Sequence, residues 1–209
     1  MRKLVLIGDI VDSKRIKNRA TIQKKLEKLF AIINSDRRFL DSPFTITLGD
    51  EFQALYNSSD NVFSDIWKII FALYPERVRF SIGLGKISTK INRLQAIGMD
   101  GPAFYHAREG MEELKGYSYL FNVRGYGITN LELIRQILFF VSHSIGKWKL
   151  TRIKIFNFLM EDTSIKVISQ ELKISDKAVY KNIDTAKMYI IMDIFKEIES
   201  YLNASIKKD

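Results

Sequence analysis

The distribution of glycine and proline constrains the fold of this chain more than any other feature of its sequence. All three prolines and ten of the eleven glycines precede residue 128, whereas residues 130–205 contain no proline and only Gly146. Short apolar runs and helical patterns alternate in the first part, but apolar residues recur at helical spacing throughout the second. We therefore expect two domains, an α/β domain over residues 1–127 and an all-helical domain over residues 128–209.

The first part is predicted to fold in the order β-α-β-β-α-β-α-β. An apolar run over residues 3–8 is typical of a buried central strand, and a helix is expected over 19–34. Two short runs around Gly49-Asp50 predict a β-hairpin, with strands over 44–48 and 51–56. Beyond it we expect a helix capped by Ser59-Asp60 and ending near Leu73, a strand over 78–84, a helix from Pro102 to about Leu114 and a strand over 119–124. This order is that of a ferredoxin-like α/β sandwich.

Composition excludes several classes of site. The 209 residues include no cysteine, which rules out disulfides, cysteine-type zinc sites and cysteine nucleophiles. With His106 and His143 as the only histidines, a histidine-rich metal site is not expected. No apolar run is long enough for a transmembrane helix, and Leu4–Ile7 is too short for a signal peptide, so we expect a cytoplasmic protein without a membrane partner. The net charge of +9 suits an anionic partner such as a nucleotide or nucleic acid.

Two carboxylates are placed to converge at one end of the predicted sheet. Asp9 ends the first strand and Asp50 lies at the hairpin tip, and the first strand of this topology lies beside the hairpin. Mg²⁺ takes oxygen ligands, commonly one or two carboxylates together with substrate phosphates, so Asp9 and Asp50 are candidate metal ligands. The alternative is that Asp9 caps a turn and Asp50 only suits a Gly-Asp hairpin.

The loop after the first strand is a candidate nucleotide-binding segment. Backbone N–H groups in such a loop often meet phosphates, and Lys14 beside Ser13 would supply a counter-charge. Gly49, next to Asp50, completes this candidate set. The alternative is that the basic residues here form a solvated helix start.

Four segments in this order resemble the motifs of class III nucleotidyl cyclases. Gly8-Asp9-Ile10-Val11 resembles the first metal-binding motif, and Thr47–Ala54, with its Gly-Asp pair, resembles the second. Arg79–Gly85 is similar to the strand that follows, and Ala107-Arg108 to the segment with the transition-state arginine. The resemblance implies that Asp9 and Asp50 bind metal and that Arg108 is catalytic.

A closer resemblance is to the SatD family of bacterial proteins. It rests on Gly8–Lys14, Gly49–Gln53 and Gly98–Arg108, and it spans most of the chain. The chain departs from the cyclases at Ile46, where they have a base-reading lysine, and at Phe104, where they have a transition-state asparagine. We therefore expect no efficient synthesis of cyclic AMP or cyclic GMP, although the retained aspartates argue against an inactive domain.

The second part contains a predicted helix-turn-helix over about residues 150–190. A helix opens at Leu150-Thr151-Arg152, a second is capped within Asp162–Ser164 and ends near Leu172, and Ser175 caps a third from Asp176 to about Tyr189. Residues 168–180 resemble the fourth region of bacterial sigma factors, except that Lys173 replaces the usual glycine. If the unit binds DNA, the third helix presents Lys177, Tyr180 and Lys181 to it. The alternative is a packing or dimerisation module, and the flanking helices over 130–146 and 188–205 are candidates for a homodimer contact.

Three functions remain open on the sequence alone. In the first, the chain is a regulator whose cyclase-like domain senses a nucleotide or metal and whose helix-turn-helix binds DNA. Alternatively, it is a Mg²⁺-dependent nucleotidyl or phosphoryl transferase that uses Asp9, Asp50 and Arg108. The third alternative is a protein-interaction module without catalysis.

Overall fold

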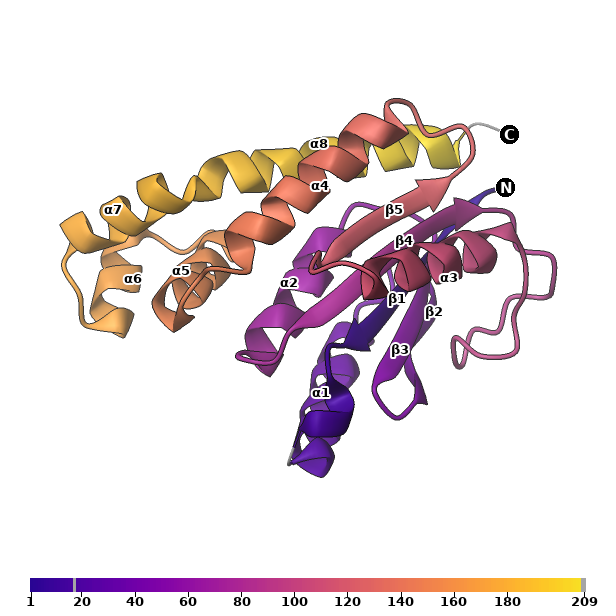
Figure 1. Ribbon diagram of the computed structural model, residues 1–209, viewed down its shortest axis with the longest axis horizontal. Coiled ribbons are helices and arrows are strands. Elements are labelled where there is room, and N and C mark those ends of the chain that lie inside the picture. The colour runs from indigo at the N-terminus through magenta and orange to yellow at the C-terminus, as the bar shows by residue number, and fades with distance from the viewer. Residues whose placement is uncertain (17, 208–209) are drawn as a thin grey trace.

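A computed structural model describes residues 1–16 and 18–207 as a mixed α/β structure with one five-stranded sheet and eight α-helices (Figure 1). The elements are β1 Lys3–Ile10, a 3₁₀ turn η1 Ser13–Arg15, α1 Arg19–Ile33, β2 Leu40–Leu48, β3 Glu51–Tyr56, α2 Val62–Leu73, β4 Val78–Gly85, α3 Pro102–Lys115, β5 Phe121–Gly125, α4 Leu131–Ile145, α5 Leu150–Met160, α6 Ile165–Leu172, α7 Asp176–Ala186 and α8 Met188–Ile206. The predicted mixed α/β class is confirmed. None of the described helices combines the length and apolarity needed to cross a membrane.

The strand order is β2-β3-β1-β4-β5, which places β1 at the centre of the sheet. β1 pairs antiparallel with both β3 and β4, β2 pairs antiparallel with β3, and β5 runs parallel to β4. β2 starts at Leu40, earlier than predicted, and includes Pro43, which its edge position tolerates because one side of the strand is unpaired.

The two faces of the sheet have separate apolar layers because successive side chains of a strand point to opposite faces. From β1, Leu4, Leu6 and Ile10 join the large cluster that includes α1 and α2, whereas Val5 and Ile7 pack with α3. By the same alternation Asp9 belongs to the α3 face, at the end of the row begun by Val5 and Ile7.

Helix α3 lies so close to β4 that the strand has no room for a side chain at the contact. A Cβ on Gly83 of β4 would overlap the carbonyl oxygen of Ala103 and the amide nitrogen of Ala107. Gly85 meets the backbone of Ala103 in the same way. The close approach fixes the height of α3 above the sheet, and with it the position of Arg108, which directly follows Ala107.

The helical second part packs on α2 through aromatic side chains. Trp67 of α2 contacts Trp148 and Phe156, with ring centroids 5.9 and 4.4 Å apart. Phe63 stacks on Phe195 of α8 at 4.3 Å. One buried cluster therefore runs from the sheet into α4–α8. The domain boundary at residue 127 stays a prediction.

Two predicted helix boundaries are wrong. The third helix of the predicted helix-turn-helix ends at Ala186, not near Tyr189, because Lys187 adopts a left-handed conformation (φ 51°) from which α8 begins. Ser59 and Asp60 do not cap α2, whose N-cap is Asn61 without a side-chain capping bond. Both residues instead hydrogen-bond to α8, a contact that no local sequence signal contains.

Candidate functional site

Asp9 lies between two charged residues of the neighbouring strands. Its backbone is in register with Glu51 of β3 on one side and Arg79 of β4 on the other. Arg79 Nη1 donates a hydrogen bond to Asp9 Oδ2 at 3.3 Å, and both side chains are largely buried. Burial and the charge of Asp50 raise the pKa of Asp9, and Lys115 and Arg79 partly oppose this. The two aspartates that the sequence singled out therefore lie within electrostatic reach of each other.

Asp50 is turned towards the loop after β1. Gly49 enables the tight hairpin with a left-handed backbone (φ 62°), which favours glycine. Asp50 Oδ2 accepts a hydrogen bond from the hydroxyl of the buried Ser13, and Oδ1 lies 3.8 Å from Arg19 Nη2. Ser13, Gly49 and Asp50 therefore lie together, while Lys14 is exposed on η1.

Arg108 reaches this end of the sheet from α3. Its Nη1 donates to both carboxylate oxygens of Glu51, at 2.8 and 2.7 Å. Glu51 is buried, whereas the Arg108 side chain is 48% exposed. Thr47 also donates to Glu51 Oε1, at 3.3 Å. The half-exposed guanidinium of Arg108 can bind an anionic ligand in place of Glu51. The ligand must then compensate for the free energy of leaving the buried Glu51 carboxylate without its cation.

The two positions at which the chain departs from the cyclases offer no polar group. Ile46 is partly buried against the large core cluster, and Phe104 packs with the smaller cluster under α3. A hydrocarbon and an aromatic ring cannot replace the hydrogen bonds of a lysine and an asparagine.

The described carboxylates do not form a metal site built from protein side chains alone. Among the residues that the structure describes, no three His, Cys, Asp or Glu side chains are grouped tightly enough to cage a metal. Mg²⁺ commonly uses one or two carboxylates and completes its octahedron with water and substrate phosphates. Asp9 and Asp50 would supply only the two carboxylates of that smaller set, so a Mg²⁺ site there stays a prediction.

The predicted helix-turn-helix has the helix caps and the tight turn that its sequence indicates. Ser164 and Ser175 accept hydrogen bonds from the amides of Val167 and Ala178, which confirms both predicted caps. Lys173 has a left-handed backbone (φ 53°), the conformation for which glycine is common at helix ends.

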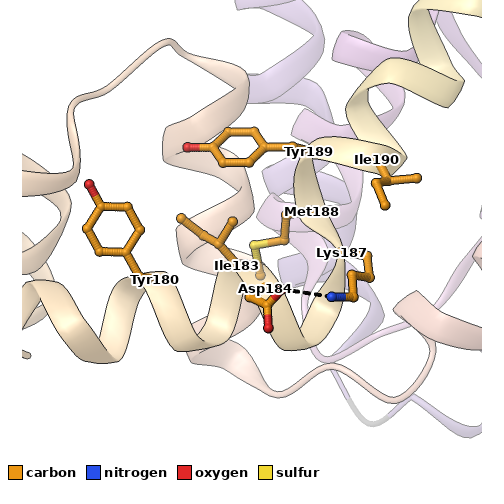
Figure 2. Close-up of a pocket in the computed structure, with 7 residues that line it drawn as sticks. All are labelled: Tyr180, Ile183, Asp184, Lys187, Met188, Tyr189 and Ile190. Atoms are coloured by element: carbon orange, nitrogen blue, oxygen red, sulfur yellow. Dashed lines mark hydrogen bonds and ion pairs between the residues drawn. The ribbon is translucent and has the colours of Figure 1, made fainter.

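On α7 the buried and exposed residues fall on opposite sides. Val179 and Ile183 are buried against the neighbouring helices, whereas Lys177, Tyr180 and Lys181 are exposed. Helix α7 packs mainly on α5, α6 and α8, and the side that carries Lys177, Tyr180 and Lys181 is exposed to solvent. Figure 2 shows Tyr180 projecting from α7, across a surface pocket of about 350 Å³ from Tyr189 of α8. Asp184 pairs with Lys187 at the junction of the two helices, at 2.7 Å.

The model of the SatD family matches this chain over residues 3–197. The chain belongs to the SatD family. No curated protein matches this SatD-family chain.

The solved structures similar to the SatD-family chain include two of a bacterial light-regulated adenylyl cyclase. They share 14 and 15% identity with it, at TM-scores of 0.39 and 0.41, and each match covers 59% of this chain and 43% of the other. The chain thus spans less than half the length of these relatives. A regulator of polyketide synthase expression from Bifidobacterium adolescentis matches 98% of this chain and 78% of its own, at 15% identity and a TM-score of 0.27. Scores this low do not establish a shared fold.

Sequence reasoning missed two members of the site in this SatD-family chain. Glu51 and Arg79 lie on either side of Asp9 in the sheet. Glu51 pairs with Arg108, and Arg79 pairs with Asp9. A signal for Glu51 was present, because an antiparallel pairing of the first strand with the hairpin brings it opposite Asp9. Nothing local marked Arg79, since its role depends on the register of β4 against β1.

Proposed function

We propose that this SatD-family protein is a cytoplasmic regulator that binds DNA through α7. Within this proposal α5, α6 and α7 form a helix-turn-helix, and β1–α1–β2–β3–α2–β4 forms a ferredoxin-like, cyclase-related unit. The strand order supports the second assignment, because the hairpin strand β3 and the last strand β4 flank β1. The observation that carries the DNA proposal is the open face of α7 with Lys177, Tyr180 and Lys181. A recognition helix must enter the DNA major groove, which is about 12 Å wide, so it needs a face that no other part of the protein covers.

Lys181→Ala is expected to weaken binding to all DNA sequences alike and to reduce the slope of log affinity against log salt by about one unit, because one phosphate contact is lost. Tyr180→Ala is expected to change sequence preference, since in this proposal its exposed ring contacts base edges. Fluorescence anisotropy with mixed-sequence duplexes over a salt series measures both effects. Lys24→Ala, which removes an exposed charge from α1, is the control and should leave the slope unchanged. Absence of binding by the unmodified protein at low salt and micromolar concentration would contradict the proposal.

A second candidate function is favoured by the carboxylates at the end of β1. We propose that Asp9 and Asp50 hold Mg²⁺ together with the phosphates of a nucleotide. Bound there, Mg²⁺ would offset phosphate charge. Ser13, Lys14 and Gly49 would face the phosphates, and Arg108 would stabilise negative charge if the site transfers a phosphoryl or nucleotidyl group. Ile46 and Phe104 leave no means of reading a purine in the cyclase manner.

Asp9→Asn is expected to reduce the Mg²⁺-dependent part of nucleoside triphosphate binding while leaving the fold intact, because the amide keeps the shape of the side chain but not its charge. Calorimetric titrations with and without Mg²⁺ separate that part from Mg²⁺-independent binding. Asp12→Asn removes an exposed carboxylate nearby and serves as the control. If Mg²⁺ makes no difference to the affinity of the unmodified protein, the candidate metal site does not exist.

A further inference from the structure

The C-terminal half of α8 is fastened to the loop between β3 and α2 by polar side chains. Asn203 Oδ1 accepts hydrogen bonds from the amide of Ser59 at 2.8 Å and from the hydroxyl of Ser58 at 3.0 Å. Asn203 Nδ2 donates to Asp60, and the Ser59 hydroxyl donates to the backbone carbonyl of Glu199 at 2.6 Å. These bonds join segments more than 130 residues apart, so they form only when α8 lies on the loop.

The carboxylate of Glu199 takes the place of the missing cap of α2. Its Oε1 accepts a hydrogen bond from the amide of Phe63 at 3.0 Å, in the first turn of the helix. The first amides of a helix have no partner within it, and Asn61 makes no side-chain capping bond. Glu199 therefore caps α2 from another helix.

The surroundings of Glu199 disfavour its negative charge. Asp60 from the loop and Asp65 from α2 lie near it, and Lys196 of its own helix is the opposing cation. Asp65 is itself held by Tyr56, Asn61 and Lys68 at 2.9–3.1 Å. Burial and these two acids raise the pKa of Glu199 from 4.5 to about 7, against the Phe63 amide and Lys196. Burial also raises the pKa of Asp65, with Lys68 and its hydrogen bonds opposing.

We propose that Glu199 and Asn203 form a proton-controlled latch, which holds the C-terminal half of α8 on the β3–α2 loop when Glu199 is protonated and weakens when it ionises. Ionised Glu199 adds a third negative charge beside Asp60 and Asp65 in a half-buried site. Releasing α8 exposes the carboxylate to water and relieves this repulsion. The latch does not depend on the proposed DNA or Mg²⁺ function. It nevertheless lies on the helix that begins where α7 ends.

The direction of the pH effect follows from the two pKa values of Glu199. The docked state, with a pKa of about 7, binds the proton more tightly than a released helix with the ordinary value of 4.5. Docking is therefore strongest below pH 4.5, weakens as the pH rises to 7, and is constant above that. Between pH 5.5 and 8.5 the docking equilibrium is expected to fall by about thirtyfold.

Hydrogen exchange of the full chain tests the latch at the amides of Ser59 and Phe63, which bond to Asn203 and Glu199 when it is closed. After correction for the intrinsic exchange rate, their protection should fall by about thirtyfold between pH 5.5 and 8.5. Glu199→Gln keeps the acceptor oxygen without the charge, so the protection of these two amides in the variant should lose most of its pH dependence. Glu197→Gln, which removes an exposed carboxylate from the same helix, should behave like the unmodified protein.

Two results would overturn the proposal. One is a Glu199→Gln protein that keeps the full pH dependence, and the other is an unmodified protein without any. Asn203→Ala provides an independent check because it removes the side-chain bonds and not the titrating group. Protection of the Phe63 amide, whose acceptor Glu199 is kept in this variant, should then fall at pH 5.5, and an unchanged value would also refute the latch.

Discussion

Replacing Gly83 by valine is expected to lower the free energy of unfolding by about 3 kcal/mol, near the upper end of what overpacking usually costs. The new side chain would overlap backbone atoms of Ala103 and Ala107 on α3, and backbone cannot change rotamer to make room. Either α3 moves away from β4 or the strand bends. Both changes expose Val5 and Ile7, which pack beneath α3.

Chemical denaturation followed by circular dichroism measures the effect as a shift of the midpoint at constant slope. Gly116→Ala is the matched control, because its Cβ would lie 3.4 Å from the nearest atom and its backbone is already helical. That substitution should change stability by less than about 0.5 kcal/mol. Equal midpoints for Gly83→Val and Gly116→Ala would show that α3 does not depend on the close approach. A second consequence is functional, since a displaced α3 carries Arg108 away from Glu51.

The elements that sequence predicted well are those with local signals. The buried run of β1, the Gly49-Asp50 turn and the Pro102 helix start each depend on residues close together in the chain. The caps at Ser164 and Ser175 are local in the same sense, and both are confirmed. The cap predicted at Ser59-Asp60 is absent because both side chains hydrogen-bond to α8, about 140 residues away in the sequence. The break at Lys187 was missed because its left-handed backbone belongs to a lysine and not to a glycine.

The candidate site follows the same division. Asp9 and Asp50 were singled out because strand ends and hairpin tips can be read from the sequence. Their partners were not, because the pairing of Arg79 with Asp9 and of Arg108 with Glu51 depends on strand register and on the height of α3. Long-range contacts of this kind carry no periodicity and no turn chemistry, which are the signals that a single sequence offers.

Trp67→Ala is expected to lower the free energy of unfolding by about 3–5 kcal/mol, the usual cost of deleting a buried aromatic side chain. Trp67 is 1% exposed and lies on α2 between the sheet and the helical second part, against Trp148 and Phe156. The cavity would therefore open at the contact between the two predicted domains. Because one buried cluster spans both, we expect the sheet and the helices to be destabilised together.

Removing Trp67 leaves Trp148 as the only tryptophan, so its fluorescence reports on the helical part while circular dichroism reports on the whole chain. The two signals should change at the same denaturant concentration, both well below that of the unmodified protein. Phe71→Ala, on the same helix but 36% exposed, is the control and should cost much less. If fluorescence changes first while most of the circular dichroism persists, residues 128–209 unfold independently and the boundary near residue 127 separates two folding units. Coincident transitions would instead mean that α2 and its aromatic contacts make the two parts one cooperative structure.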